Sequence, residues 1–412
     1  MKKIKYSLWA LAAAVLLLGA VEGVLRLTSN YSSSPGYVFR PEAGFVFDPA
    51  TAPNRVNSMG FIDKQRDPGA SDRPRVLLLG DSFVAGTTLA SHLETRLGQA
   101  LGEPVEVIPM GFPGVGMGNM LAYYEAFGRA FKPKAVVVVF NASTFANNSP
   151  LLYSLKIRPD PRATDSFFMV RDPDGQCRRI APSPDFSDHR LAELPLHMTP
   201  TLGDRIDAAL DGVLGWSYGY NWLKDSIRQQ DDKGFLSQDH TFAYRLAQLR
   251  AVPEFAASFE GWAYPDDLDM NMMFWTETAA MPPVFKDALA GTECLLRTFG
   301  DASRADDFAF LIVVGEDCAV PTSTMRAEFD YRAGKSGRKF VEAGNRKKIM
   351  ALARQAEVEA LDLAPIITPI RDKAHPPGDI HLTESGNEAA AGAISDALIK
   401  RTDFSKMLAG RQ

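Results

Sequence analysis

The sequence predicts an α/β fold of three layers, with helices on both faces of a mainly parallel sheet. Unbroken apolar runs of strand length alternate with segments whose apolar residues recur at helical spacing. This alternation is typical of right-handed crossovers between parallel strands. It is interrupted at residues 151–282, where Pro- and Asp-rich loops replace it. We therefore expect one α/β domain in two halves, residues 73–150 and 283–412, separated by a large insertion.

The individual elements follow from apolar patterns. The stretch "RVLLLG", Arg75 to Gly80, predicts a strand that is buried on both faces. The next segment predicts a helix whose apolar stripe consists of Leu89, Leu93, Leu97 and Leu101. The rest of the first half consists of a strand within 104–114, a helix at 117–131 and a strand within 133–141. The second half supplies helices at 282–300, 344–358 and 384–402 and strands at 307–315 and 359–365.

The charge balance argues against one class of partner. The chain has 412 residues and a formal charge of -5 at pH 7, with a sequence pI near 5.8. No Lys/Arg-rich run occurs beyond the N-terminus, whereas a nucleic-acid binder needs a basic face to collect phosphates. We therefore expect no nucleic-acid partner.

The N-terminus has the pattern of a membrane anchor. Lysines at positions 2, 3 and 5 precede an apolar run at 8–21, which orients the chain with its N-terminus inside and the rest exported. Because the residues around Gly19 to Gly23 make poor cleavage sites, an uncleaved anchor is favoured over a cleaved signal peptide. The expected parts are a cytosolic tip at 1–5, a transmembrane anchor at 6–27 and a lead-in segment at 28–72. The predicted location is the bacterial inner (cytoplasmic) membrane, single-pass, with the domain in the periplasm or another extracytoplasmic space.

Cys177, Cys294 and Cys318 are widely spaced and form no C-x-x-C pattern, so a zinc site is not expected. An exported compartment permits one disulfide with one cysteine left over, but three buried thiols fit the sequence as well. The acidic residues within 266–269 lack the spacing of an EF-hand. We predict neither a metal nor a cofactor.

Ser82 stands directly after the first predicted strand, at the edge where open α/β sheets place their ligand sites. A nucleophilic serine needs a base, and His381 has the best setting among the six histidines. It lies in a loop that opens the final helix. Asp379, two residues earlier, could hold the imidazole in the tautomer that accepts the serine proton. A lone Gly-Asp-Ser is a common turn, so the prediction of a catalytic site depends on this distant pair.

The motifs "GDSF", followed by Gly86, and "GDIHLTESGN" resemble the SGNH/GDSL hydrolase family. The segments "RVNSMGFID", "VIPMGFPGVGMGN", "DLAPIITP" and "VEGVLRL" resemble its exported, membrane-anchored branch, which is similar to polysaccharide O-acetyltransferases and acetylesterases. The resemblance covers roughly residues 52–150 and 283–400 and leaves out the insertion. It implies an SGNH-hydrolase-like, flavodoxin-like fold.

The resemblance also implies roles for individual residues. Ser82 would be the nucleophile, His381 the base and Asp379 the residue that orients His381. The N–H groups of Ser82 and Gly114 would contribute to an oxyanion hole. The spacing of two between Asp379 and His381, instead of the commoner three, resembles the variant seen in polysaccharide O-acetyl transfer relatives.

One block departs from the family pattern. Where the family has Gly-Asn-Asp, an ungapped alignment places Ala142-Ser143-Thr144, so Ser143 replaces an asparagine that donates to the oxyanion. Its hydroxyl has a shorter reach, and losing one oxyanion donor typically costs about 10²- to 10³-fold in rate. Asn141 could substitute for it, as could Asn147 or Asn148.

The insertion carries large aromatic residues among acidic ones: Trp262, Tyr264, Phe274 and Trp275. Aromatic faces beside carboxylates are typical of sugar-binding clefts, but a satellite hydrophobic core is the slightly favoured alternative. Of the other histidines, His92 is expected to be packed or solvated on its helix. His375 is expected to have a role in its loop or to line the pocket.

Two functions are predicted. The first is a membrane-anchored, extracytoplasmic serine esterase or O-acyltransferase that acts through an acyl-serine intermediate. Its substrates would be acyl esters, above all acetyl, of an envelope or secreted polysaccharide or of a small molecule, and the resemblance implies a membrane-embedded acyltransferase as partner. The alternative, motivated by Ser143, is a catalytically weakened SGNH-like protein that binds glycan or scaffolds a polysaccharide-modifying complex.

Overall fold

The computed structural model describes residues 35–69, 71–141, 143–156, 166–182, 253–262, 267–316, 337–376 and 379–401, together with residues 19, 246–247, 249–250, 327, 330–331, 334–335 and 404. The chain divides into two compact units. Residues 36–196 and 242–412 form the unit that contains nearly all described residues, and residues 1–35 and 197–241 form the other. The predicted tip and anchor at 1–27 lie outside the described residues, Gly19 excepted. No helix in the described part of the chain is long and apolar enough to cross a membrane.

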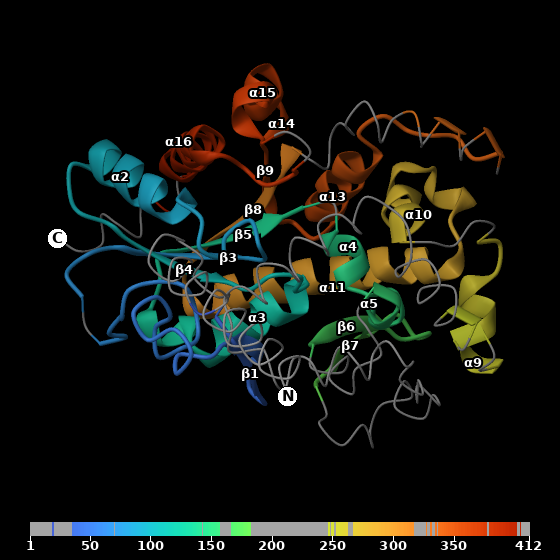
Figure 1. Ribbon diagram of the computed structural model, residues 1–412, viewed down its shortest axis with the longest axis horizontal. Helices are drawn as coiled ribbons and strands as arrows, with labels where there is room; N and C mark the ends of the chain where they lie inside the picture. The colour runs from blue at the N-terminus through green and yellow to red at the C-terminus, as the bar shows by residue number, and fades with distance from the viewer. Residues whose placement is uncertain are drawn as a thin grey trace, which may run out of the picture. The chain divides into compact units, whose positions relative to one another are not determined.

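A parallel sheet forms the centre of the larger unit (Figure 1). Its strands among the described residues are β3 (Arg75–Gly80), β4 (Glu106–Gly111), β5 (Ala135–Phe140), β8 (Ala309–Val314) and β9 (Glu359–Asp362). They are ordered β4-β3-β5-β8-β9, and every neighbouring pair is parallel. This order corresponds to the 2-1-3-4-5 arrangement of flavodoxin-like sheets. The predicted α/β class with a mainly parallel sheet is therefore confirmed.

Helices cover both faces of the sheet because alternate strand residues point to opposite sides. The main helices are α2 (Leu89–Leu101), α3 (Met117–Ala126), α11 (Pro283–Asp306), α13 (Gly344–Gln355) and α16 (Glu384–Lys400). Val76 and Leu78 belong to the core under α2 and α16, whereas Leu77 and Leu79 belong to the core shared by α3, α11 and α13. Figure 1 shows α2 and α16 above the sheet and α3 and α11 below it. The predicted helix at 117–131 ends earlier than expected, and a 3-10 turn, η1 (Gly128–Phe131), follows it.

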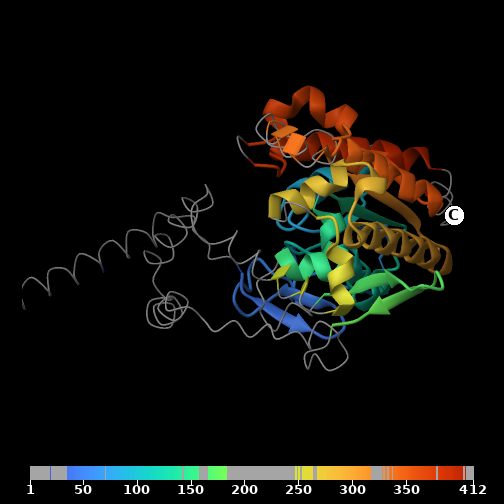
Figure 2. The same cartoon turned by 90° about the vertical axis from the view of Figure 1, so that its right-hand side faces the viewer.

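Two antiparallel hairpins lie on the α3 and α11 side of the sheet (Figure 2). The lead-in forms β1 (Tyr37–Arg40) and β2 (Gly44–Phe47), and the insertion forms β6 (Phe168–Arg171) and β7 (Cys177–Ile180). Short helical elements complete this side: α4 (Thr144–Asn147), α5 (Pro150–Lys156), α9 (Pro253–Ala256), η3 (Ala257–Phe259), α10 (Asp267–Met272), η4 (Met273–Trp275) and η5 (Thr278–Ala280). The described parts of the insertion thus share the core of the α/β domain.

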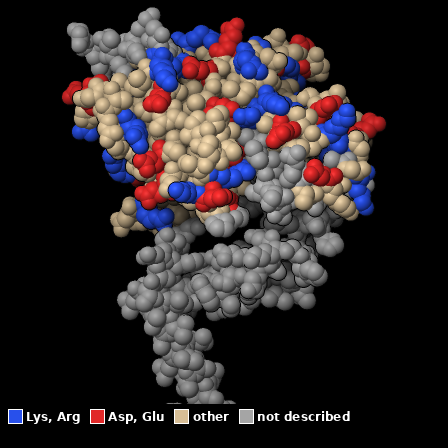
Figure 3. Space-filling model, turned by 90° about the horizontal axis from the view of Figure 1, so that it is seen from above, with Lys and Arg blue, Asp and Glu red and all other residues tan. Residues whose placement is uncertain are grey.

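Three short helical elements follow the last strand. β9 ends three residues earlier than predicted, at Asp362, and is followed by α14 (Ala364–Ile367), η7 (Thr368–Ile370) and α15 (Arg371–Ala374). The loop that carries His381 then runs from α15 to the start of α16. On the face seen in Figure 3, acidic and basic side chains are mixed instead of being gathered by sign.

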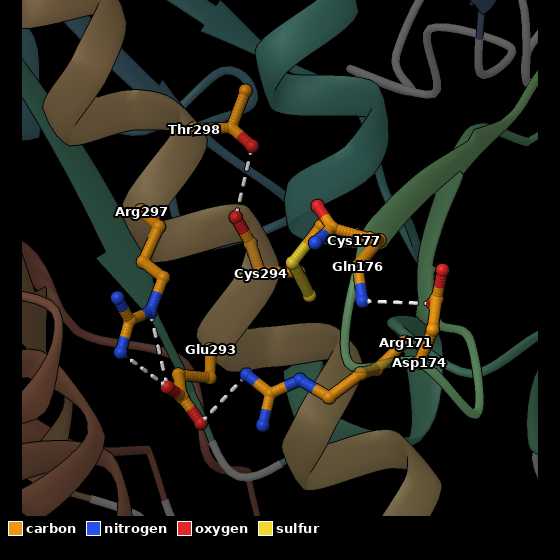
Figure 4. The surroundings of a disulfide bond; sticks show 8 residues. All are labelled: Arg171, Asp174, Gln176, Cys177, Glu293, Cys294, Arg297 and Thr298. Carbon is orange, nitrogen blue, oxygen red and sulfur yellow. Dashed lines mark hydrogen bonds and ion pairs between the residues drawn. A yellow bond between two sulfur atoms is a disulfide. The ribbon is translucent and has the colours of Figure 1, made fainter.

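A disulfide joins Cys177 of β7 to Cys294 of α11, across 117 residues of sequence. Figure 4 shows Glu293, next to Cys294, between two guanidinium groups. Arg171 of β6 lies 3.0 Å from one carboxylate oxygen, and Arg297 lies 2.8 Å from the other. The hairpin of the insertion is therefore held to α11 both covalently and by an ion pair. Cys318 lies outside the described residues.

A second ion-pair network ties the lead-in to the amino ends of β3 and β4. Glu106 accepts from Arg66 Nη1 at 2.9 Å and from Arg75 Nε at 2.8 Å. Arg66 also bonds to Asp63 and to the Val107 carbonyl. Burial opposes ionisation of Glu106, but hydrogen bonds from Arg66 and Arg75 and their charges outweigh it, so the Glu106 pKa is lowered.

We expect Glu106→Gln to lower the free energy of unfolding by about 1–3 kcal/mol at pH 7, because both arginines lose a charged partner. The lowered Glu106 pKa means that its stabilisation is present above the unfolded carboxyl pKa and is lost as pH falls through the folded value. The difference between wild type and variant, measured by urea unfolding, should therefore shrink on acidification. Glu388→Gln, in an exposed pair with Arg96, should change stability far less. Equal losses in the two variants would contradict this role of Glu106.

We expect Cys177→Ser to destabilise the fold by about 2–4 kcal/mol, because the disulfide restricts the unfolded chain. Reductant should lower the melting temperature of wild type to about that of Cys177→Ser. The melting temperature of the variant itself should not respond to reductant. Cys318→Ser serves as the matched control and should keep the reductant response of wild type. A wild-type melting temperature that ignores reductant would contradict the expectation.

Candidate active site

Ser82 lies in a tight turn between β3 and α2, at the carboxyl edge of the sheet. Asp81 shapes this turn: its carboxylate accepts from Phe83 N at 3.1 Å, and its carbonyl accepts from Val84 N and Ala85 N. The turn packs closely against the end of β4, because a Cβ on Gly111 would lie 2.6 Å from Ala85 N. The glycine is therefore needed for this close approach.

The structure brings Ser82, His381 and Asp379 together. His381 Nε2 lies 2.8 Å from Ser82 Oγ. On the other side of the ring, His381 Nδ1 lies 2.6 Å from Asp379 Oδ1, which also accepts from the His381 main-chain N–H at 2.9 Å. Asp379 thus favours the tautomer with a proton on Nδ1, and this leaves Nε2 able to accept the serine proton.

Asp379 remains a strong acceptor although it is partly desolvated. Burial alone would raise its pKa, but the two hydrogen bonds from His381 and the charge of that imidazole outweigh burial, so the Asp379 pKa is lowered. The side chains of His381 and Asp379 are 41% and 49% exposed. The His381 and Asp379 end of the site is therefore open to solvent.

Two further side chains position the His381 ring and its backbone, and the sequence alone did not assign them that role. The Phe83 ring lies against the imidazole, with centroids 4.9 Å apart. His375 Nδ1 lies 3.1 Å from the His381 carbonyl oxygen. Phe83 follows Ser82 directly in the chain, and this proximity in sequence was a usable signal.

Ser82 and Gly114 lie in the loops that follow two neighbouring strands, β3 and β4. Gly80 at the end of β3 pairs with Gly111 at the end of β4, so the two loops leave the sheet side by side. Gly114 has a φ of +76°, in the left-handed region that favours glycine. Neither the Ser82 N–H nor the Gly114 N–H donates to an acceptor among the described residues, so both are free to bind an oxyanion.

Asn141 and Ser143 are instead bonded to each other and to the serine turn. The buried Asn141 amide donates to the Asp81 carboxylate. Its carbonyl oxygen accepts from Ser143 N at 2.9 Å and from Ser143 Oγ at 2.8 Å. A hydroxyl has one proton to donate, and that of Ser143 is directed to Asn141. Asn141 and Ser143 therefore support the turn that holds Ser82.

Asn147 and Asn148 are also buried and bonded elsewhere. Asn147 donates to the Val115 carbonyl at 3.4 Å. Asn148 accepts from Met117 N at 2.7 Å and donates to Thr292 of α11 at 2.9 Å. Both amides hold the segment that follows Gly114.

Three of the four aromatic residues proposed for a platform are not exposed. Trp262, Phe274 and Trp275 are at most 3% exposed, and Trp262 and Phe274 belong to the main hydrophobic core. The satellite-core interpretation is therefore correct in kind, although this core is continuous with that of the domain. Tyr264 lies outside the described residues.

We expect Asn141→Ala to lower the free energy of unfolding by about 1–3 kcal/mol, because it leaves the buried Asp81 carboxylate without that donor. Ser143→Ala removes only a bond to Asn141 and should cost less. The same order should hold for the rate at which a fluorophosphonate labels Ser82, since Asp81 shapes its turn. Thermal unfolding and intact-mass spectrometry measure the two effects. Equal effects of both substitutions would contradict the asymmetry.

No family model matches the chain, and no curated protein matches it. Among solved structures, it is similar to a lipase/acylhydrolase from Enterococcus faecalis, with 13% identity over 79% of this chain and 95% of the other and a TM-score of 0.33. It is also similar to an acetylxylan esterase from Geobacillus stearothermophilus, with 10% identity, coverages of 78% and 92% and a TM-score of 0.33. A lipase from a goat rumen metagenome matches with 10% identity, coverages of 79% and 97% and a TM-score of 0.31. At these values none of the three assigns a function to this chain, whose chemistry follows from its own residues.

Proposed function

We propose that this protein is an SGNH-like serine esterase or O-acyltransferase. The observation that carries the proposal is the hydrogen-bonded chain from Ser82 Oγ through His381 to Asp379. A serine, an imidazole and a carboxylate in this order form the arrangement that activates a hydroxyl for acyl transfer. The motifs that resemble the SGNH/GDSL family support the same assignment.

In the proposed reaction Ser82 Oγ attacks the ester carbonyl while His381 Nε2 takes its proton. The carbonyl oxygen becomes an oxyanion, which the N–H groups of Ser82 and Gly114 stabilise. His381 then gives the proton to the leaving alkoxide, and an acyl-serine remains. Water or a sugar hydroxyl completes the cycle by the same steps in reverse, so hydrolysis and transfer use one site.

We further propose that the acceptor or substrate is an acylated polysaccharide outside the cytoplasm, with acetyl as the acyl group. The exposure of His381 and Asp379 suits a polymer that lies across an open site. The disulfide suits an oxidising compartment, and the lysine-flanked apolar run at the N-terminus suits an inner-membrane anchor. A membrane-embedded acyltransferase as partner is suggested only by the family resemblance.

The engagement of Asn141 and Ser143 with each other favours a slow enzyme, because a side-chain oxyanion donor is worth about 10²- to 10³-fold. The same observation supports the alternative function, a catalytically weakened protein that binds glycan or acts as a scaffold. Three of the residues proposed for its binding surface, Trp262, Phe274 and Trp275, are buried.

We expect the full-length protein to release nitrophenol from p-nitrophenyl acetate and Ser82→Ala to lower kcat/KM by at least about 10³-fold. Ser91→Ala, an exposed serine on the following helix, is the matched control and should behave as wild type. Mass spectrometry of an added oligosaccharide would then distinguish transfer from hydrolysis. Equal rates for wild type and Ser82→Ala would refute the enzyme proposal and favour the binding alternative.

A further inference from the structure

Besides Asp379 and His381, another acid and histidine lie close together beside the same loop, and the side chains of both are largely buried. Glu316 follows β8 by two residues and is 4% exposed. His375 follows α15 directly, and its side chain is 12% exposed. Neither group has a role in the Ser82, His381 and Asp379 chain, and burial of two ionisable groups is costly unless each is paired.

Both ring nitrogens of His375 face acceptors. Nδ1 lies 3.1 Å from the His381 carbonyl oxygen, and Nε2 lies 3.4 Å from a carboxylate oxygen of Glu316. Nε2 makes no hydrogen bond, so its contact with Glu316 is an ion pair by distance alone. In a neutral ring that donates from Nδ1 to His381, the Nε2 lone pair would face the Glu316 carboxylate, whereas an imidazolium presents an N–H on both sides. The proximity of Glu316 therefore favours the charged ring.

The surroundings strengthen this selection. Glu316 and His375 line a small cavity of about 20 Å³ whose other side chains are apolar, Phe83, Leu363 and Ile394 among them. Among the described residues, the further charge that faces the pair comes from α15, where Arg371 lies 2.7 Å from Glu316. Thr368 also donates to Glu316, at 3.2 Å. The residues of α2, β5, α14 and α16 that line the cavity are aliphatic. The Glu316 carboxylate raises the pKa of His375, against burial and the charge of Arg371. Burial of Glu316 is outweighed by His375 and Arg371, so its own pKa is lowered.

The contact to His381 holds a loop that otherwise depends on its two ends. At one end Thr383 N donates to the Ala374 carbonyl at 2.8 Å. There Gly386 packs so closely that a Cβ would lie 2.6 Å from the Ala374 oxygen. Between these ends the His381 main chain is held by Asp379 and by His375. A shift of this peptide would move Nε2 away from Ser82, and a displacement of about 1 Å can cost about 10²-fold in rate.

We propose that His375 is a positioning residue that works as an imidazolium: Glu316 keeps it charged, and it anchors the His381 carbonyl so that Nε2 faces Ser82. This inference rests on the proposed function. Because the His375 pKa is raised above its ordinary value of about 6.5, the anchored state is complete below that value. It is lost as pH rises through the folded pKa, so activity has an alkaline limb that belongs to His375.

The first test is the pH profile of kcat/KM with p-nitrophenyl acetate in the full chain. We expect Glu316→Gln to move the alkaline limb to lower pH by at least about one unit, and the non-titrating His375→Gln to flatten it. His375→Leu should lower kcat by about 10- to 100-fold with little change in KM. His92→Gln, on α2 and with no hydrogen bond from its side chain to the described part of this loop, should leave the limb in place. If the alkaline limb of the kcat/KM profile has the same position in Glu316→Gln and in His375→Gln as in wild type, the proposal is overturned.

The second test does not need activity. In ¹⁵N-histidine-labelled protein, we expect His375 to be doubly protonated at neutral pH and to become neutral in Glu316→Gln. We also expect the His381 resonances to shift in His375→Leu and not in His92→Gln. If His375→Leu does not fold, the double variant Glu316→Leu/His375→Leu removes both charges together and is the replacement.

The two proposals fail separately. Absence of Ser82-dependent turnover in wild type refutes the enzyme function, and the spectra still decide whether His375 is charged and positions His381. A neutral His375 in wild type, or unshifted His381 resonances without the His375 ring, overturns the positioning role even if the enzyme is active.

Discussion

The parallel register of β3 with β4 on one side and β5 on the other is the constraint on which the rest of the structure depends. Because the three strands run in the same direction, their carboxyl ends meet at one edge of the sheet. Gly80 pairs with Gly111, and Leu79 pairs with Val138. A shift by one residue would turn each buried side chain to the opposite face, so the two apolar cores specify this register. The same register sets which loops meet beyond the strand ends.

The polar groups at this edge hold one another in place before any substrate is present. Asp81 links the serine turn to Asn141 at the end of β5, and Ser143 holds the Asn141 amide in the orientation that reaches Asp81. Each of these groups is paired where it is buried, as a low-dielectric site requires. Ser143 thus supports the contact between Asn141 and the turn that carries Ser82.

The histidine comes from a different part of the fold and is held by different means. Its loop joins α15 to α16, and side-chain contacts to Asp379, Phe83 and His375 orient the ring and its main chain. Main-chain hydrogen bonds to the Asp81 carbonyl thus shape the turn that carries Ser82, whereas side-chain contacts orient His381.

The sequence by itself predicted the strands of the parallel sheet and the main helices, and its motifs nominated Ser82, Asp379 and His381. Strands and helices are local properties, because apolar spacing over a few residues selects one or the other. A serine after a buried strand must also lie at the edge of the sheet. The tertiary structure decided which distant groups meet. Cys177 is bonded to Cys294, and aromatic side chains of the insertion lie in the core. His375 lies between Glu316 and the His381 carbonyl. These contacts join residues that have no fixed spacing in the chain, and only the packing of whole elements against one sheet determines the distances between them.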